Sequence, residues 1–482
     1  MKVILIEPGS PAEHVFSRFK LPRLGLASIG TIARDQGWEV KIYVEELASL
    51  NWPEIISADL VGVSSLTPTA NRALEIIKKI KEKKPDLPIV VGGPHFTFLP
   101  EEALQAGADF VVRHEGEATF TELIDHLKNC AERPLSEIKG LSFKNDGQII
   151  HNPDRPLLEN LDLLPFPDFR LIVNHQKIVN NLIQISRGCP YSCTFCSVTR
   201  MFGQRIRSRE NVQAIVDEIE FLNKTYQQRF LIFSKSKHFF PYDDNFYGKP
   251  RISKEILREI IRRNLKIEFG IQVRLDVAKD REFLDLARRA GVKILYIGYE
   301  STNPETLEVF DKGLSVEEMA SYTKILKSYN FRLHGMFVLG ADTDTEAVIK
   351  QTVRFAKANK INTVQFIILV PLPGTPPFKE MEESGRLKHK NWSEYDGHHV
   401  VFRPLNMSER TLLYGTMVKG MLSFYSRWRC FKKIFPVFLH LPFLSKTPWK
   451  EKLMDFARYL YGHRLLVNWL RQKKSQSSKN PS

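Results

Sequence analysis

Arg187-Gly188-Cys189-Pro190-Tyr191-Ser192-Cys193-Thr194-Phe195-Cys196 holds three of the five cysteines of this 482-residue chain, at the spacing Cx3Cx2C. Three thiolates on one short loop can converge on a soft metal centre, and Fe–S clusters are the usual centre with all-thiolate ligation. The other cysteines, Cys130 and Cys430, are remote, so such a set would leave one iron of a [4Fe–4S] cluster open. Zinc completed by a remote histidine is the alternative, although no Hx3–5H pair flanks the loop.

Length and composition predict two or three globular domains. No run of eighteen or more uncharged apolar residues occurs, so we expect no membrane-spanning helix. Met1–Glu7 lacks the apolar core of a signal peptide and is typical of a strand. Five cysteines, three of them clustered, do not form a disulfide framework, so we expect a cytoplasmic protein. The net charge of +15 favours a nucleic acid, an anionic membrane surface or a phosphorylated substrate as partner, with a lysine-rich solvated surface as the alternative.

Residues 1–130 alternate short β-branched runs with amphipathic helical patterns such as Leu24–Asp35 and Asn71–Glu82. The expected strands are Val3–Ile6, Glu39–Val44, Leu60–Ser64, Pro88–Val91 and Phe110–Val112. Continuous apolar strands between helices indicate a parallel sheet covered on both faces. The pattern therefore predicts an α/β, flavodoxin-like (Rossmann-like) doubly wound domain.

Small polar residues follow three of these strands, in Ser64-Ser65-Leu66-Thr67, Gly92-Gly93-Pro94-His95 and Glu115-Gly116-Glu117. Ligands of doubly wound folds bind at the carboxyl ends of the strands, where hydroxyls and glycines let a backbone approach closely. We therefore expect a binding site there; ordinary turns and helix caps are the alternative.

Residues 131–181 are less regular. Asn145-Asp146-Gly147 predicts a hairpin tip between Leu141–Phe143 and Ile149–Ile150. Four prolines then punctuate an extended stretch, Pro153, Pro156, Pro165 and Pro167. We interpret this region as a linker with a hairpin between two domains.

Residues 182–378 repeat the strand–helix rhythm six times. The expected strands are Leu182–Ser186, Phe230–Phe233, Lys266–Val273, Lys293–Gly298, Leu333–Leu339 and Thr363–Val370. Six such units predict a partial (β/α)6 TIM-like barrel, with its chemistry at the C-terminal ends of the strands. The cysteine loop follows the first strand, where such a barrel places its active site.

Residues 379–482 are expected to form an α-helical basic and aromatic region with a disordered end from Gln472. Between Ser426 and Lys474 there are twelve Lys or Arg residues, whereas the only acidic residues are Glu451 and Asp455. The apolar run Phe435–Leu444 between lysines favours a membrane surface or a lipid-like substrate over a nucleic acid. Plain packing against the barrel is the alternative.

The Cx3Cx2C loop after the first strand of a six-fold βα repeat resembles the radical S-adenosylmethionine (SAM) superfamily, including the aromatic Phe195 before the third cysteine. The resemblance implies that Cys189, Cys193 and Cys196 bind a [4Fe–4S] cluster whose open iron is chelated by SAM. Reduction then cleaves SAM to methionine and a 5′-deoxyadenosyl radical. It also implies a reduced ferredoxin or flavodoxin as electron donor.

Two further segments agree with this resemblance. Asp243-Asp244-Asn245 is similar to the acidic segment after the second barrel strand, and Gly298-Tyr299-Glu300-Ser301 resembles the end of the fourth. The resemblance therefore implies SAM contacts from Phe195, Asp243, Asp244, Asn245, Glu300 and Ser301. One feature differs: Ser234–Tyr242 separates the expected second strand from Asp243, whereas relatives run almost directly from strand to acidic segment.

A doubly wound domain before such a barrel resembles the cobalamin-binding subgroup of the superfamily. The resemblance implies cobalamin contacts from Ser65, Thr67, Gly92, Gly93 and Glu117. The motif DxHxxG is absent, because His14 has no Asp two residues before it. We expect cobalamin bound without a protein histidine; a domain that binds no cobalamin is the alternative.

The resemblance implies a cobalamin-dependent radical SAM methyltransferase that acts on an unactivated carbon of a small-molecule or lipid-like substrate. A cyclase or ring-rearranging enzyme of the same architecture is the main alternative. A tRNA methylthiotransferase would carry a second three-cysteine set in the N-terminal domain, where only Cys130 occurs. A non-catalytic binding protein is disfavoured by the intact cysteine triplet.

Overall fold

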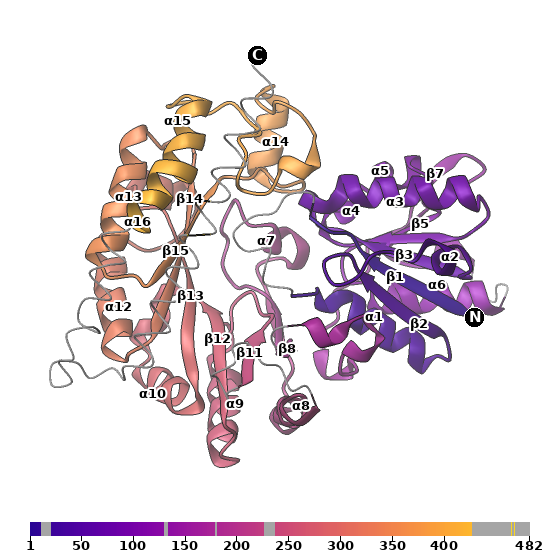
Figure 1. Ribbon diagram of the computed structural model, residues 1–482, viewed down its shortest axis with the longest axis horizontal. Helices are drawn as coiled ribbons and strands as arrows, with labels where there is room; N and C mark the ends of the chain where they lie inside the picture. Colours follow the sequence, from indigo (N-terminus) through magenta and orange to yellow (C-terminus); the bar gives the residue numbers. More distant parts are fainter. Residues whose placement is uncertain are drawn as a thin grey trace.

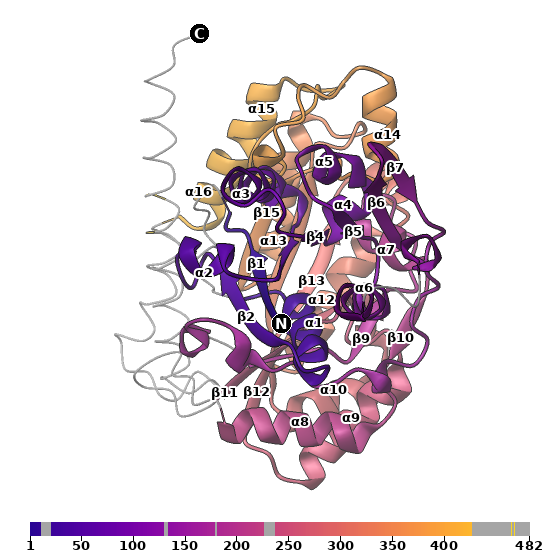
Figure 2. The same ribbon diagram turned by 90° about the vertical axis from the view of Figure 1, so that its right-hand side faces the viewer.

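A computed structural model describes residues 1–10, 21–129, 134–178, 181–225 and 237–426, with Arg464 and Val467. It contains two large sheets that are neighbours in both views (Figures 1 and 2). Of the expected basic and aromatic C-terminal region, residues 379–426 are described, and apart from Arg464 and Val467 the rest lies outside the described residues. Within the described parts, no helix is both long and apolar enough to cross a membrane.

The N-terminal sheet has the strand order β2-β1-β3-β4-β5-β6-β7. Its parallel strands are β1 (Lys2–Glu7), β2 (Glu39–Val44), β3 (Leu60–Ser64), β4 (Ile89–Gly92) and β5 (Phe110–Val112). Their order, 2-1-3-4-5, is the flavodoxin-like order, which confirms the predicted fold class. The helices are α1 (Leu24–Asp35), α2 (Trp52–Ile56), α3 (Ala70–Lys83), α4 (Pro94–Phe98), α5 (Pro100–Gln105) and α6 (Glu117–Asn129).

The predicted hairpin is formed by β6 (Leu141–Asn145) and β7 (Gln148–His151). The sequence predicts that it belongs to the linker, but β6 pairs antiparallel with β5, so the hairpin extends the N-terminal sheet. It covers backbone groups that an edge strand would leave unpaired. At the opposite edge, the Val173 N–H donates to the carbonyl of Ile42 in β2 at 2.9 Å. The connecting segment therefore lies against the N-terminal domain.

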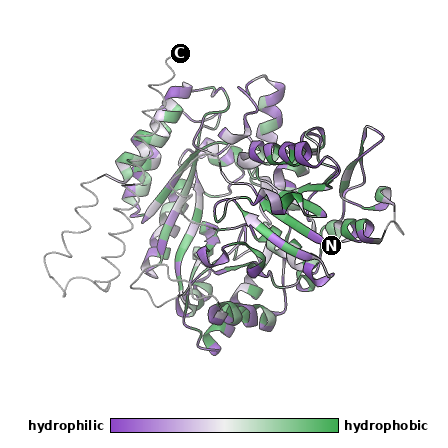
Figure 3. Cartoon of the chain, turned by 45° about the vertical axis from the view of Figure 1, so that its right-hand side comes forward, coloured by the Kyte–Doolittle hydropathy of each residue, from purple (hydrophilic) through white to green (hydrophobic). Residues whose placement is uncertain are grey.

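The second sheet is the predicted partial barrel, with six parallel strands in sequential order. They are β8 (Asn181–Ile183), β11 (Lys237–Pro241), β12 (Ile267–Val273), β13 (Val292–Glu300), β14 (Arg332–Leu339) and β15 (Thr363–Ile368). Its helices include α8 (Val212–Thr225), α9 (Pro250–Arg262), α10 (Arg281–Ala290), α11 (Pro304–Val309), α12 (Val316–Ser328) and α13 (Glu346–Ala358). Hydrophobic residues concentrate in the strands and hydrophilic ones on the outer helices (Figure 3).

Two barrel strands differ from the sequence prediction. The expected strand Phe230–Phe233 lies outside the described residues, and the strand that pairs with β8 and β12 is β11. The expected first strand is divided into β8 and β9 (Ser186–Gly188). β9 leaves the barrel sheet and pairs antiparallel with β10 (Ile206–Ser208). The chain therefore turns just before Cys189.

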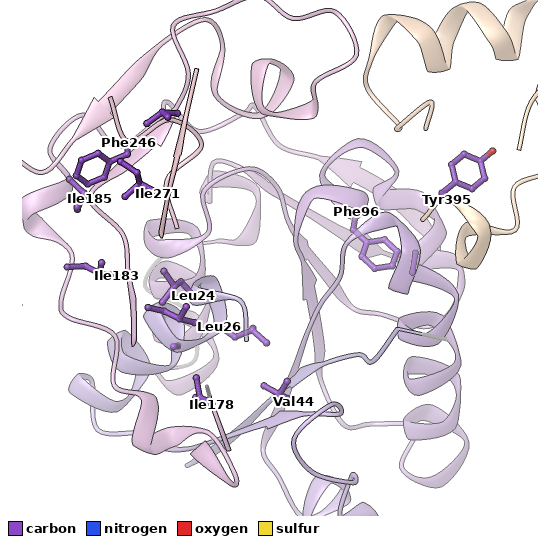
Figure 4. Close-up of a cluster of buried hydrophobic side chains, with 14 of the residues drawn as sticks. Leu24, Leu26, Val44, Phe96, Ile178, Ile183, Ile185, Phe246, Ile271 and Tyr395 are labelled. Atoms are coloured by element: carbon purple, nitrogen blue, oxygen red, sulfur yellow. The ribbon is translucent and has the colours of Figure 1, made fainter. Parts of the chain in front are cut away.

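One apolar core joins the two domains to the segment after the barrel. Figure 4 shows buried side chains from α1 (Leu24 and Leu26), from the barrel (Ile183 and Ile271) and from the later segment (Tyr395). That segment contains α14 (Pro376–Glu383), α15 (Glu409–Leu413), a π-helical turn (Tyr414–Gly420) and α16 (Met421–Phe424). The shared core fixes the N-terminal domain beside the barrel.

Candidate functional site

The cysteine loop runs from β9 to α7 (Ser197–Phe202). Cys196 is the N-cap residue of α7 in an extended conformation, and its N–H donates to the carbonyl of Cys193 at 3.1 Å. Figure 1 shows α7 between the barrel strands and the N-terminal domain. The loop therefore lies at the mouth of the barrel, where the sequence predicts it.

The three thiols lie close enough for their charges to interact. Burial, together with the neighbouring Cys193, Asp244 and Cys189, raises the pKa of Cys196 to about 11. Burial also raises the pKa of Cys189. Three adjacent thiolates are unfavourable without a cation, so the donor set fits a bound metal cluster. In the described residues no three His, Cys, Asp or Glu side chains converge as for a single ion. This is compatible with a [4Fe–4S] cluster, because each cysteine binds a different iron.

Asp243 and Asp244 hold the strand that leads into this loop. One Asp243 carboxylate oxygen accepts the N–H groups of Ile185 and Ser186, at 2.9 and 2.6 Å. Asp244 accepts the N–H of Gly188 at 3.0 Å. β11 ends at Pro241, only two residues before Asp243, so the predicted separation between strand and acidic segment is wrong.

The neighbouring Asn245 is nearly buried, and its side-chain oxygen accepts the Tyr247 N–H at 3.2 Å. This hydrogen bond stabilises the turn between Asn245 and Tyr247. The three residues of the predicted SAM segment are thus brought to the base of the cysteine loop, where they orient backbone.

Glu300 ends β13 in the left-handed region, with φ of 62°, where the pairing with β14 is irregular. Its carboxylate lies 3.1 Å from Nζ of Lys312, and both side chains are largely buried. A Cβ at Gly298 would lie 2.1 Å from Oε1 of Glu300, so a side chain at this position would displace the carboxylate. Ser301 is fully buried and accepts the Asn303 N–H at 3.0 Å, so it serves the turn.

The cysteine loop also rests on the segment that joins α11 to α12. Phe195 packs on Phe310, with ring centroids 4.6 Å apart, and the Thr194 hydroxyl donates to the Val309 carbonyl at 3.0 Å. Ser192 donates to Asp311. The predicted Phe195 therefore supports the shape of the loop.

A buried ion-pair network joins the loop to the N-terminal domain. Arg187 donates to Glu115 at 3.0 Å and to Glu117 at 2.6 Å, and Arg207 donates to Glu115 at 2.7 Å. Burial alone would raise the pKa of Glu115, but the two arginines and the Leu158 N–H together outweigh it and lower that pKa. Glu117, a predicted cobalamin contact, is thus bound to Arg187, for which the sequence predicts no role.

The other predicted cobalamin residues gather at the ends of β3 and β4. Ser65 and Thr67 are buried; the Ser65 hydroxyl contacts Thr69 at 2.9 Å and Thr67 contacts His95 at 3.3 Å. Gly93 has φ of 98°, and a Cβ there would lie 2.4 Å from the Ser65 carbonyl oxygen.

At this edge the polar side chains contact one another, and the backbone of Gly93 lies against that of Ser65. Leu66, for which the sequence predicts no contact, is 38% exposed at the same edge. Beside it, Trp392 of the later segment donates to Glu102 at 2.9 Å.

Two family models match the chain. One, described as the B12 binding domain, matches residues 17–124, and the other, the Radical SAM superfamily, matches residues 183–356. A relative from Synechocystis, an anaerobic magnesium-protoporphyrin IX monomethyl ester cyclase, is 30% identical over 68% of this chain and 67% of its own length. This chain belongs to the radical SAM superfamily. The matched pair of domains confirms the predicted subgroup with an N-terminal B12-binding domain.

Two further matches span more of the chain. An uncharacterized methyltransferase of Pyrococcus horikoshii is 29% identical over 92% of this chain and 96% of its own length. The solved structure of the radical SAM methyltransferase TsrM from Kitasatospora setae, with cobalamin and a [4Fe–4S] cluster bound, covers 80% of this chain and 75% of its own, with a TM-score of 0.65 and 21% identity. The likeness to the TsrM structure supports the two-domain fold described above.

Proposed function

We propose that this chain is a cobalamin-dependent radical SAM methyltransferase that acts on an unactivated carbon. The observation that carries the proposal is the cysteine loop at the barrel mouth, tied through Arg187 to the strand ends of the B12-binding domain. In such an enzyme the cluster supplies the electron for SAM cleavage and cobalamin carries the methyl group. The ion pairs would hold the two cofactor sites in a fixed relation.

We assign the ligands by residue. Cys189, Cys193 and Cys196 would hold three irons of the cluster, leaving the fourth for SAM. Asp243, Asp244 and Asn245 would position the loop beside SAM, with Phe195 and Ser301 shaping its surroundings. Glu300 would lie with Lys312 at the strand end that faces SAM.

For cobalamin, the packing of Ser65 and Thr67 and the ion pair of Glu117 favour indirect roles. The close backbone approach at Gly93, next to Gly92 at the end of β4, and the exposed Leu66 side chain support direct contact at this edge. His95 is buried against Thr67 and Glu102, which supports binding without that histidine as a cobalt ligand.

A cyclase is the second candidate, because the Synechocystis relative carries that name. It would use the same cluster and SAM residues on a differently placed substrate. The substrate would be a small or lipid-like molecule. A ferredoxin or flavodoxin donor, a cytoplasmic location and membrane contact through the C-terminal region remain predictions.

The function can be tested without knowing the substrate. The protein is reconstituted with iron, sulfide and cobalamin without oxygen, reduced, and supplied with SAM labelled in its methyl group. We expect a [4Fe–4S] optical band, 5′-deoxyadenosine among the products, and label on the recovered cobalamin.

The control replaces Cys189, Cys193 and Cys196 together with alanine. We expect it to lose the cluster band and 5′-deoxyadenosine, because no iron ligands remain in the loop. A cluster that persists in this variant contradicts the ligand assignment. 5′-Deoxyadenosine without labelled cobalamin favours the cyclase.

A further inference from the structure

Arg274 lies against the cysteine loop, directly after β12. Its guanidinium is centred 3.6 Å from the ring centre of Tyr191, and Nη1 lies 3.7 Å from Sγ of Cys193. The Arg274 side chain is 11% exposed. A cation is thus held beside one cysteine sulfur with little water around it.

Three contacts fix this position. Nη2 of Arg274 donates to the carbonyl of Lys312 at 2.5 Å, and the Tyr191 ring covers one face of the guanidinium. Asp276 accepts the Tyr191 hydroxyl at 2.9 Å and lies 3.8 Å from Nε of Arg274. Tyr191 belongs to the cysteine loop, so the loop and the guanidinium are positioned together.

The charge of Arg274 is incompletely compensated by the protein. Its Nε is buried without a hydrogen-bond partner among the described residues, because the Asp276 carboxylate is too distant. A neutral thiol is a weak acceptor, whereas a thiolate is a strong one. The burial of this guanidinium is therefore well compensated only when Cys193 is anionic, as in a cluster.

We propose that Arg274 is a positioning residue that raises the reduction potential of the [4Fe–4S] cluster; this rests on the ligation proposed above. Reduction adds one electron to the cluster and transfers no atom, so the cluster becomes more negative by one charge. Net charge and hydrogen bonds to the sulfurs set the potentials of such clusters. An arginine stays protonated at all working pH values, so it favours the reduced form constantly.

The same geometry predicts the opposite effect for Asp276. Its carboxylate partly offsets the guanidinium and is held near the loop by Tyr191. Replacing it with asparagine leaves the cation less opposed, so the cluster becomes easier to reduce. A merely structural role for the two residues does not predict opposite signs.

The test measures the cluster midpoint potential by optical and EPR titration with mediators, without SAM or substrate. In Arg274→Gln we expect at least a tenfold lower reduced-to-oxidised ratio at the wild-type midpoint, which corresponds to about 59 mV for one electron. Asp276→Asn should shift the potential upward. Arg274→Lys should lie between wild type and Arg274→Gln. Arg289→Gln, which removes an exposed arginine of α10, should not move it.

Cluster content is measured first, by iron and by the optical band. A wild-type protein that assembles no cluster contradicts the ligation itself. Loaded Arg274→Gln and Asp276→Asn with the wild-type potential overturn the role of Arg274, while the ligation stands. If Arg274→Gln loads no cluster, the Asp276→Asn variant decides. An upward shift of its midpoint potential supports the role of Arg274, and a downward shift or none overturns it.

Discussion

At the scale of single residues, Asp243 has the most perturbed carboxylate of the site. One of its oxygens binds two backbone N–H groups, and the other is buried without a partner among the described residues. Burial raises its pKa from 3.8 to about 7, against those hydrogen bonds. Between these values the folded protein retains a proton that the unfolded chain releases, so Asp243 makes stability fall as pH rises.

Asp243→Asn should remove this dependence, because asparagine keeps the accepting oxygen and carries no charge. From pH 4 to pH 7, the free energy of unfolding of the wild type should fall relative to the variant by up to roughly 4 kcal/mol, at about 1.36 kcal/mol per pKa unit. Above pH 7 the difference in the free energy of unfolding between the two proteins should no longer change with pH. Denaturant unfolding of both proteins at several pH values measures it.

Asp146→Asn, at the exposed hairpin tip, is the matched control and should follow the wild type. A constant difference between wild type and Asp243→Asn from pH 5 to pH 8 would show that Asp243 stays ionised in the folded protein.

The cysteines and the acidic segment could be predicted because each is a short pattern in sequence. Their partners could not. Arg274 is 81 residues from Cys193, and Glu117 is 70 residues from Arg187. Nothing local in either arginine's sequence distinguishes it from a solvated charge. One feature of the sequence could have indicated their roles: Arg187 and Arg274 both lie next to strand ends near the mouth of the barrel.

At the scale of elements, β13 ends in a conformation that depends on one glycine. Glu300 turns back over Gly298 to reach Lys312. A side chain at position 298 would force the carboxylate away and leave Lys312 buried without its partner. The lack of a side chain at Gly298 therefore leaves room for the Glu300–Lys312 ion pair at the strand end.

Gly298→Ala should destabilise the protein by about 1–3 kcal/mol, as expected for an overpacked site. Gly25→Ala is the matched control, since a Cβ there meets no atom of the described residues within 4 Å and position 25 lies in α1. It should be neutral or stabilising by up to about 1 kcal/mol. Thermal unfolding of both variants makes the comparison; equal effects would contradict the steric argument.

Strands with continuous apolar runs were predicted well, and β11 was not. Phe230–Phe233 is four apolar residues in a row, which favours a buried strand. β11 contains Lys237, His238 and Pro241, residues that usually argue against one. Proline is tolerated because it stands at the last position of the strand. Pairing with β8 and β12 outweighs the local preference.

At the scale of the whole molecule, the two domains are joined by a shared apolar core and by the network around Arg187. Removing one partner of a buried charge pair costs about 3–5 kcal/mol, because the remaining charge is left without compensation. The network is therefore a sensitive measure of how tightly the domains are held together.

Arg187→Met should lower the free energy of unfolding by this amount and separate the unfolding of the two domains into two transitions. Adding Glu117→Gln should recover part of the loss, since one buried charge is removed. Urea unfolding monitored by fluorescence and limited proteolysis measures both effects. Arg200→Met, on the exposed side of α7, should change stability by no more than about 0.5 kcal/mol. A single unchanged transition in Arg187→Met would contradict the linkage.

The contact of Trp392 with Glu102 has a consequence for how the protein is made. The two residues are 290 positions apart, and Asn71 reaches Asn391 over 320. A ribosome produces the N-terminal sheet first, and domains generally fold as they emerge. The rim of that sheet nevertheless stays uncovered until the whole barrel has been translated. The first domain to be synthesised is thus completed only after the second has been made.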